Sequence, residues 1–73
     1  RLDVPEPVPL VHLTPRERVV LEHLVVHDTL PAVAAALTVS VNTVKKQTLR
    51  IYAKLGVNER GAALRRAREL GLV

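Results

Sequence analysis

Residues 40–57 read S-V-N-T-V-K-K-Q-T-L-R-I-Y-A-K-L-G-V, and this stretch decides the fold. Ser40 is a good helix N-cap because its hydroxyl can accept hydrogen bonds from the free N–H groups of the first turn. Gly56 stands where a left-handed residue commonly ends a helix. Between these caps, residues suited to a buried face recur at steps of three and four, at Val44, Thr48, Ile51 and Leu55. The stretch therefore predicts a helix over 41–55 that is buried along one face.

The opposite face of this helix is mainly polar and cationic. At about 100° per residue it carries Asn42, Lys45, Lys46, Leu49, Arg50 and Ala53. A helix that packs on a core by one side and offers an amide, cations and an aliphatic side chain on the other suits the major groove of DNA. Groove binding is a hypothesis that the rest of the chain must support.

Composition narrows the classes of function. The chain has 73 residues, which is enough for one small domain. One Tyr and no Phe or Trp leave little aromatic surface for stacking unpaired bases. There is no Cys for disulfides or thiolate chemistry, and no apolar run approaches the length of a membrane span. Paired carboxylates, a nucleophile beside a base and a phosphate-binding Gly loop are not recognisable, so we do not expect an enzyme.

Charge is distributed unevenly along the chain. Residues 1–30 contain three basic and five acidic residues, whereas residues 31–73 contain eight basic and two acidic ones. A basic surface favours nucleic acid because neutralised phosphates release their counterions. A basic surface can also be merely solvated, and charge alone does not decide between these two interpretations.

The first twelve residues form a Pro-rich segment, R-L-D-V-P-E-P-V-P-L-V-H. Each Pro removes a backbone donor and favours extended geometry, so residues 1–12 are interpreted as a stiff linker. The chain begins at Arg1 and contains no Met, so we expect a piece of a longer protein in which this linker follows an upstream domain. The folded domain then occupies residues 13–73. A Pro-rich ligand for an SH3-type groove is the alternative use of the segment.

A helix over about 14–26 is predicted to precede the opening stretch. Thr14 and Glu17 have the spacing of a capping box, and Pro15 occupies the first helical position, where its missing N–H costs nothing. His23 and His27 lie four residues apart on this helix, but no third metal ligand is arranged nearby, so we expect two surface or boundary histidines and no metal site. The predicted buried stripe is Val20, Leu21, Leu24 and Val25.

Two more helices complete the predicted domain. A helix over about 29–37, capped by Asp28 or Thr29, consists of small residues that let another helix cross closely, as in a helix-turn-helix. A helix over about 59–70 follows, with Asn58 as the predicted cap and Gly71 as the terminator. Its inward residues should be Ala63, Leu64, Ala67 and Leu70.

Four spaced motifs resemble a known family. They are L-T-P-R-E-R-x-V-L at 13–21, S-V-N-T-V-K at 40–45, R-I-Y-x-K-L-G-V at 50–57 and A-x-x-R-A-R-E-L-G-L at 63–72. The set is similar to the DNA-binding domain of LuxR-type (GerE/NarL/FixJ-like) bacterial transcription regulators. The resemblance implies an all-α, four-helix helix-turn-helix domain without a wing, at the C-terminus of a cytoplasmic regulator. The helix over 41–55 would be its recognition helix.

The resemblance also implies partners. Double-stranded DNA is the expected ligand, and the usual arrangement is a homodimer on DNA through the fourth helix. RNA polymerase is a candidate further partner, whereas no membrane, cofactor, metal or small-molecule ligand is expected for this domain. The fourth helix would contact the second subunit through its outer face, which carries Ala62, Arg65, Arg66 and Glu69.

The residue pattern and the resemblance together predict specific contacts. Lysine can donate to guanine O6 and N7, and leucine can contact a thymine methyl group, so Lys45, Lys46 and Leu49 are expected to contact base edges. The start of a helix binds phosphate through its free N–H groups and its dipole. Contacts to phosphate or to bases at the rim are predicted for Ser40, Asn42, Thr43, Arg50 and Lys54.

Several positions depart from the family pattern, and three of them bear on the turn, the core and the bases that are read. Thr38 stands where a turn Gly is common, and Lys46 stands where Thr or Val is frequent. Thr48 replaces an apolar core residue, which costs burial unless its hydroxyl donates to a carbonyl of the preceding turn.

Two other functions remain open from the sequence. A promoter-reading domain of a sigma factor shares the L-x-P-R-E-R opening and the T-V-K recognition helix, although the predicted fourth helix favours the LuxR type. A helical protein-interaction module would instead bind an acidic partner through the basic face. Absence of salt-dependent affinity for any duplex would favour that module.

Overall fold

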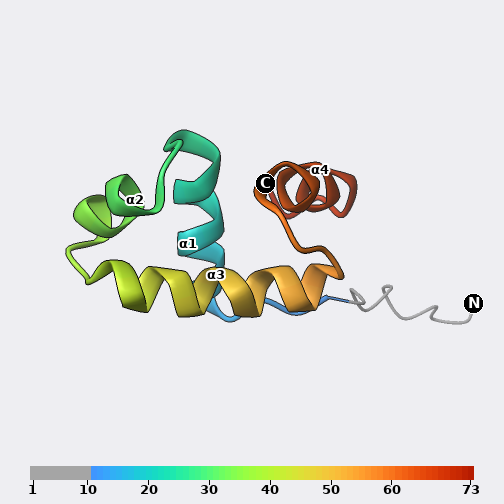
Figure 1. Cartoon of the computed structure of the whole chain (residues 1–73). Coiled ribbons are helices and arrows are strands. Elements are labelled where there is room, and N and C mark those ends of the chain that lie inside the picture. Colours follow the sequence, from blue (N-terminus) through green and yellow to red (C-terminus); the bar gives the residue numbers. More distant parts are fainter. Residues whose placement is uncertain (1–10) are drawn as a thin grey trace, which may run out of the picture.

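The computed structural model describes residues 11–73, so most of the predicted linker over 1–12 lies outside the described residues. This part of the chain contains four helices and no strand: α1 (Pro15–Val26), α2 (Leu30–Leu37), α3 (Val41–Leu55) and α4 (Arg60–Glu69). The prediction of an all-α, four-helix domain is therefore confirmed. In Figure 1, α3 runs along one side of the domain, with α2 over its N-terminal end, α1 over its middle and α4 over its C-terminal end.

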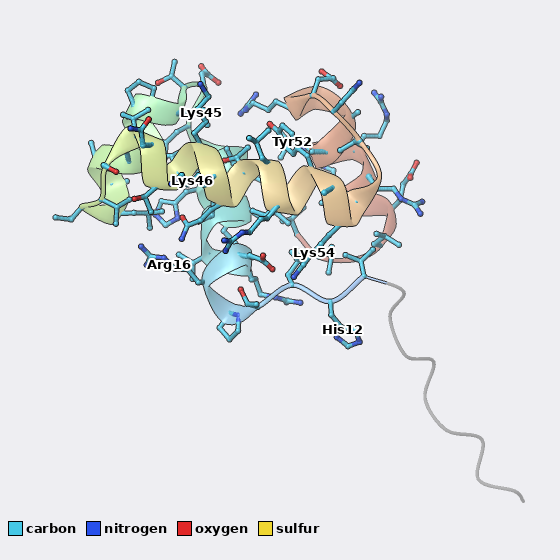
Figure 2. All side chains as sticks on the ribbon, turned by 60° about the horizontal axis from the view of Figure 1, so that its bottom comes forward. His12, Arg16, Lys45, Lys46, Tyr52 and Lys54 are labelled. Atoms are coloured by element: carbon cyan, nitrogen blue, oxygen red, sulfur yellow. The ribbon has the colours of Figure 1, made fainter. Side chains whose placement is uncertain are left out.

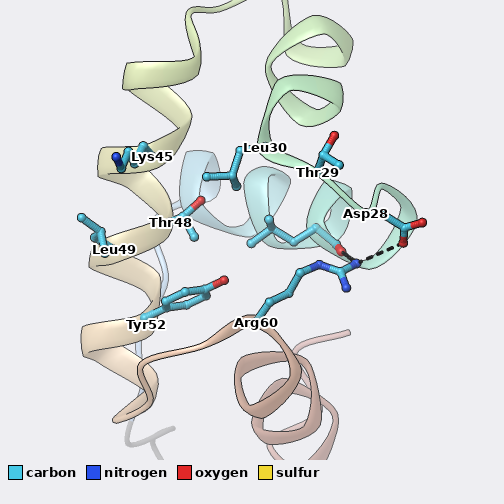
Figure 3. A pocket seen from close by; sticks show the side chains of 9 residues that line it. Asp28, Thr29, Leu30, Lys45, Thr48, Leu49, Tyr52 and Arg60 are labelled. Carbon is cyan, nitrogen blue, oxygen red and sulfur yellow. Dashed lines mark hydrogen bonds and ion pairs between the residues drawn. The ribbon is translucent and has the colours of Figure 1, made fainter.

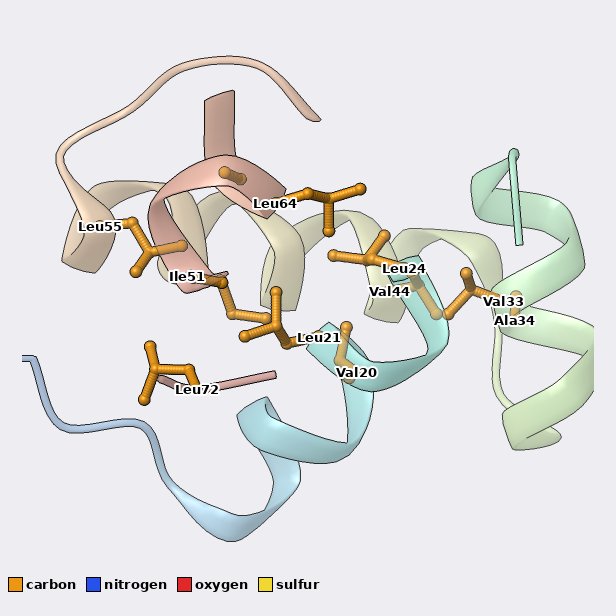
Figure 4. Packing of buried hydrophobic residues seen from close by; sticks show 12 residues of the cluster. Val20, Leu21, Leu24, Val33, Ala34, Val44, Ile51, Leu55, Leu64 and Leu72 are labelled. Atoms are coloured by element: carbon orange, nitrogen blue, oxygen red, sulfur yellow. The ribbon is translucent and has the colours of Figure 1, made fainter. Parts of the chain in front are cut away.

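An aliphatic core joins the four helices (Figure 4). The core is closed at the C-terminus by Leu72, which follows α4 and packs with the helices. Burying a side chain of this kind stabilises the fold by about 1.5–3 kcal/mol, so even this small core fixes the position of α3. The largest fully buried side chains are Val20, Leu21, Leu24, Val33, Val44 and Ile51.

The predicted buried stripe of α1 is wrong at one position. Val25 is 38% exposed, whereas the charged residue Glu17 is only 6% exposed. The observed stripe starts at Glu17 and continues through Val20, Leu21 and Leu24, which follow it at steps of three, four and seven residues. Val25 lies about 80° away from Glu17 around the helix. Valines on several sides of α1 hid this phase, which is set by contacts with α3.

The helix caps agree with the sequence at α1, α2 and α3 but not at α4. Thr14 and Glu17 form the predicted capping box, and Thr29 caps α2. The cap of α4 is Glu59 instead of the predicted Asn58. The carbonyl of Glu59 accepts the first helical hydrogen bond, and its carboxylate folds back to accept from the N–H groups of Gly61 and Ala62. A long acidic side chain can therefore do what the shorter Asn was expected to do.

The turn between α2 and α3 contains a strained residue. Thr38 has φ 58° and ψ 44°, a left-handed conformation that is unusual for a β-branched residue. The N–H of Val39 donates to the carbonyl of Ala34 at 3.0 Å. This hydrogen bond ends α2, and the left-handed residue that permits it is usually Gly. The departure noted at Thr38 is thus a position where the fold requires a positive φ.

Replacing Thr38 by glycine is expected to stabilise the domain by about 1 kcal/mol, because glycine adopts the left-handed conformation without a Cβ clash. Part of the gain is offset by the greater freedom of glycine in the unfolded chain. The midpoint of thermal unfolding should rise by roughly 4–8 °C. Ala36→Gly, at an exposed position within α2, is the control and should lower the midpoint by a similar amount. A lower midpoint for Thr38→Gly would contradict strain at this turn.

Candidate DNA interface

One face of α3 is free of contacts with the core. The face predicted to be polar is exposed at every position, and Leu49 retains 59% of its accessible surface. The opposite face is buried as predicted, at Val44, Thr48, Ile51 and Leu55. Figure 2 looks onto the exposed face, where Lys45 and Lys46 project from the N-terminal half of α3. The structure therefore brings Lys45, Lys46 and Leu49 onto one accessible surface.

The start of α3 is held by two hydroxyl groups. Ser40 Oγ accepts from the N–H of Thr43 at 3.1 Å, and the two side-chain oxygens lie 2.9 Å apart. The cap thus engages the N–H of Thr43, the third residue of α3. The N–H groups of Val41 and Asn42 make no hydrogen bond within the helix, because they lie in its first turn. Both Val41 and Asn42 are exposed, so this end of the helix is accessible to an anion. The predicted phosphate contacts of Ser40, Asn42 and Thr43 remain predictions.

Lys54 is already engaged inside the domain. Its Nζ lies 2.6 Å from Glu17 Oε1 and donates to the carbonyl oxygen of His12 at 3.0 Å. The hydrogen bond from Lys54 lowers the pKa of Glu17, against the raising effect of burial. Lys54 is thus less suited to the predicted phosphate contact than Arg50. Sequence analysis identified Glu17 as part of a capping box but gave no sign that it is also the partner of Lys54.

The cations of α3 form a row along the helix. Lys46, Arg50 and Lys54 follow one another at intervals of four residues and so lie on one side. No acidic residue is present in α3, and the carboxylate of Glu17 comes from α1. Most of this row is therefore unneutralised, which makes the surface attractive to an anionic polymer.

Arg60 joins the start of α4 to the end of α1. Its Nη2 donates to the carbonyl oxygens of Leu24 and His27, the latter at 3.0 Å, and lies 3.9 Å from Asp28 Oδ1. Carbonyl groups in the last turn of a helix lack intrahelical partners, so the guanidinium satisfies groups that would otherwise be unpaired. This role was not recognised from the sequence, because the partners lie more than thirty residues away.

The outer face of α4 and the histidines of α1 make few contacts. Arg65, Arg66 and Glu69 are exposed and Ala62 is half-buried, and Arg66 Nη1 lies 3.6 Å from Glu69 Oε1.

The rings of His23 and His27 stack with centroids 5.8 Å apart, and His23 Nδ1 lies 2.9 Å from the carbonyl oxygen of Val19. Within residues 11–73, no three His, Cys, Asp or Glu side chains lie close enough together to hold a metal ion. No helix in the same range is long and apolar enough to cross a membrane.

Comparison with known proteins decides the family. The profile for bacterial regulatory proteins of the luxR family matches residues 11–67, which include the capping box of α1, the turn at Thr38 and all of α3. The chain belongs to the LuxR family. It is thus a LuxR-type helix-turn-helix domain, and its family is one of DNA-binding transcription regulators.

Two proteins similar to this LuxR-family domain are named as probable transcriptional regulatory proteins. A protein called probable transcriptional regulatory protein NarL, from Mycobacterium tuberculosis strains CDC 1551 / Oshkosh and ATCC 25618 / H37Rv, is 46% identical to the domain over 55 residues. The match covers 75% of this chain but only 26% of each relative. The LuxR-family domain therefore spans about a quarter of these relatives. No solved structure matches it significantly.

Proposed function

We propose that this chain is the output domain of a bacterial transcription regulator in the cytoplasm and binds specific double-stranded DNA with α3 in the major groove. Residues 13–73 would form the DNA-binding domain, which residues 1–12 would tether to an upstream domain. The single observation that carries the proposal is the exposed, acid-free face of α3, whose reverse side is fixed in the core. A rigid helix with donors on one side can insert in a groove about 12 Å wide.

Base contacts would come from the centre of the exposed face. Lys45 and Lys46 are adjacent and exposed, and each can donate to guanine O6 or N7. Leu49 is one turn further along and lacks an apolar neighbour on its outer side, as its 59% exposure indicates. A thymine methyl group would cover part of that aliphatic surface.

Phosphate contacts would flank the base contacts. The N-terminal end of α3, with Ser40, Asn42 and Thr43, offers N–H groups and the positive end of the helix dipole. Arg50 is exposed on the other side of the base-reading residues and can form a bidentate contact to phosphate. Such contacts fix the register of the helix and carry no sequence information by themselves.

A dimer on DNA would use the outer face of α4. Arg65, Arg66 and Glu69 are exposed there beside the half-buried Ala62, and a two-fold axis can pair unlike charges across such a face. RNA polymerase is a further proposed partner, contacted by surfaces that the DNA and the dimer leave free.

Selection of bound duplexes from a random pool tests the proposed function. We expect enrichment of two inverted half-sites with centres about 10 base pairs apart, or a multiple of that spacing. Affinity for the enriched duplex should fall steeply as salt increases. A single asymmetric site would contradict the dimer but not DNA binding. No enrichment, together with affinity independent of salt, would contradict DNA binding and favour a protein-interaction module.

A further inference from the structure

The helix α4 packs on α1 and α3 through a face of mostly small residues (Figure 1). Its buried residues are Ala63, Leu64 and Ala67, so leucine is the only large side chain that α4 places in the core. Helices commonly fix their relative orientation when ridges of larger side chains interlock. The two alanines permit a close approach, but they resist rotation of α4 about its own axis only weakly. A directional contact is therefore needed to define how α4 is turned.

Arg60, the first residue of α4, supplies such a contact (Figure 3). Its Nη2 donates to the carbonyl oxygens of Leu24 and His27 and lies 3.9 Å from Asp28 Oδ1. Leu24 lies in the last turn of α1 and His27 is its C-cap, so both carbonyls lie beyond the regular helical hydrogen bonds. The two hydrogen bonds therefore hold the start of α4 against the end of α1 in a defined direction.

Other polar contacts do not share this task. Within residues 11–73, Arg60 is the one residue of α4 whose side chain bonds to a group outside that helix and its cap. The ion pair between Arg66 and Glu69 lies within α4. A pocket of about 260 Å³ opens between Arg60 and Tyr52 of α3, so packing against α3 is incomplete on this side (Figure 3). The orientation of α4 thus depends on the link from Arg60 to α1.

We propose that Arg60 is a positioning residue that sets the spacing of the two DNA half-sites bound by a dimer. The inference rests on the proposed function, in which the outer face of α4 forms the dimer contact and α3 enters the groove. Turning α4 within each subunit moves both copies of α3 relative to the two-fold axis, and symmetry makes the two displacements equal and opposite. A change of about 3.4 Å in their separation along the duplex corresponds to one base pair. Arg60 therefore acts on spacing through α4 and not through a contact to DNA.

Residual dipolar couplings of the free chain test the link between Arg60 and α4 without DNA. In the wild type, the backbone N–H couplings of α1, α3 and α4 should fit one rigid arrangement. Arg60→Met keeps a long unbranched side chain but removes the donors, so the couplings of α4 should shrink and leave the common fit. Arg60→Gln, which is too short to reach α1, should behave alike and replaces Arg60→Met if that variant does not fold.

Duplexes with altered half-site spacing test the consequence for DNA binding. The wild type should prefer the selected spacing over spacings one base pair longer or shorter by the coupling through α4, typically about 5–150-fold. Arg60→Met should bind all three spacings with similar affinity, while its affinity for a single half-site stays at the wild-type value. Arg68→Met, which removes an exposed arginine of the same helix, is the matched control and should keep the preference. A variant that is only less stable would also keep it.

The outcomes separate this inference from the function on which it rests. Unchanged α4 couplings, or a spacing preference that persists in Arg60→Met, would overturn the role of Arg60 and leave the proposed function intact. Loss of folding in both Arg60→Met and Arg60→Gln would also overturn it, because Arg60 would then hold the whole fold. A wild type without any spacing preference would contradict the dimer, and absence of duplex binding would contradict DNA binding. Either of these two results removes the spacing role together with the function.

Discussion

Replacing Lys46 by alanine is expected to weaken binding of the preferred duplex by roughly ten- to a hundredfold, equivalent to about 1–3 kcal/mol. The lysine is exposed at the centre of the outer face of α3, where no acidic side chain of that helix competes for it. Loss of a base contact should relax the preference at one base pair, whereas loss of a phosphate contact should weaken all duplexes alike. Titrations with the preferred duplex and with single-base variants of it measure both quantities.

Matched variants separate base reading from general charge. Arg68→Ala removes one exposed positive charge from α4 and should change affinity little and selectivity not at all. Leu49→Ala should make the domain insensitive to deoxyuridine in place of the contacted thymidine, a change that weakens wild-type binding by removing the methyl group. If Lys46→Ala and Leu49→Ala keep both affinity and selectivity, the assignment of this face to the groove is wrong.

Replacing Glu17 by glutamine should lower the free energy of unfolding by about 2 kcal/mol. Glu17 Oε1 accepts from Lys54 Nζ at 2.6 Å and from the N–H of Thr14 at 2.9 Å, so one carboxylate ties α3 to the start of α1. Removing its charge leaves Lys54, whose side chain is 37% exposed, without an ionic partner, and weakens the hydrogen bonds of the buried Glu17 side chain. Urea unfolding of Glu17→Gln measures the loss. Glu22→Gln, exposed on the same helix, should be neutral.

The same pair predicts a pH dependence of stability. The hydrogen bond from Lys54 lowers the pKa of Glu17 in the folded state below its ordinary value of 4.5. The unfolded chain therefore takes up a proton at higher pH than the folded domain does, and acid favours unfolding. The contribution of Glu17 is present above about pH 4.5 and is lost as the pH falls through the lowered pKa of the folded state. Glu17→Gln should show a flatter dependence in this window, and an identical slope would contradict the ion pair.

The sequence predicts the helices well because their signals are local. The caps and periodicity that define α3 lie within eighteen residues, and the structure confirms both its bounds and its buried face. Thr38 was recognised as a substitute for a turn Gly, and it adopts a positive φ. Val25 and Asn58 were assigned wrongly, because several valines on α1 gave no single phase and because Asn58 and Glu59 are both able to cap.

The site is only partly readable from the sequence. Exposure of Lys45, Lys46 and Leu49 follows from the helical period, and the structure confirms it. Contacts between distant residues do not follow from any local pattern. Lys54 pairs with Glu17, which is 37 residues away in the sequence, and Arg60 donates to the carbonyl of Leu24, which is 36 residues away. Those contacts depend on how the helices pack. The roles of individual residues on DNA stay predictions.

The row formed by Lys46, Arg50 and Lys54 has an energetic consequence for the domain alone. Like charges four residues apart on a helix destabilise it by about 0.2–0.5 kcal/mol per pair, and Glu17 offsets this only at the Lys54 end. Dissolved ions screen such repulsion, so salt strengthens the free fold along α3 while it weakens attachment to a polyanion. The free domain is thus slightly destabilised by repulsion between these cations, and phosphates that approach the row would reduce that repulsion.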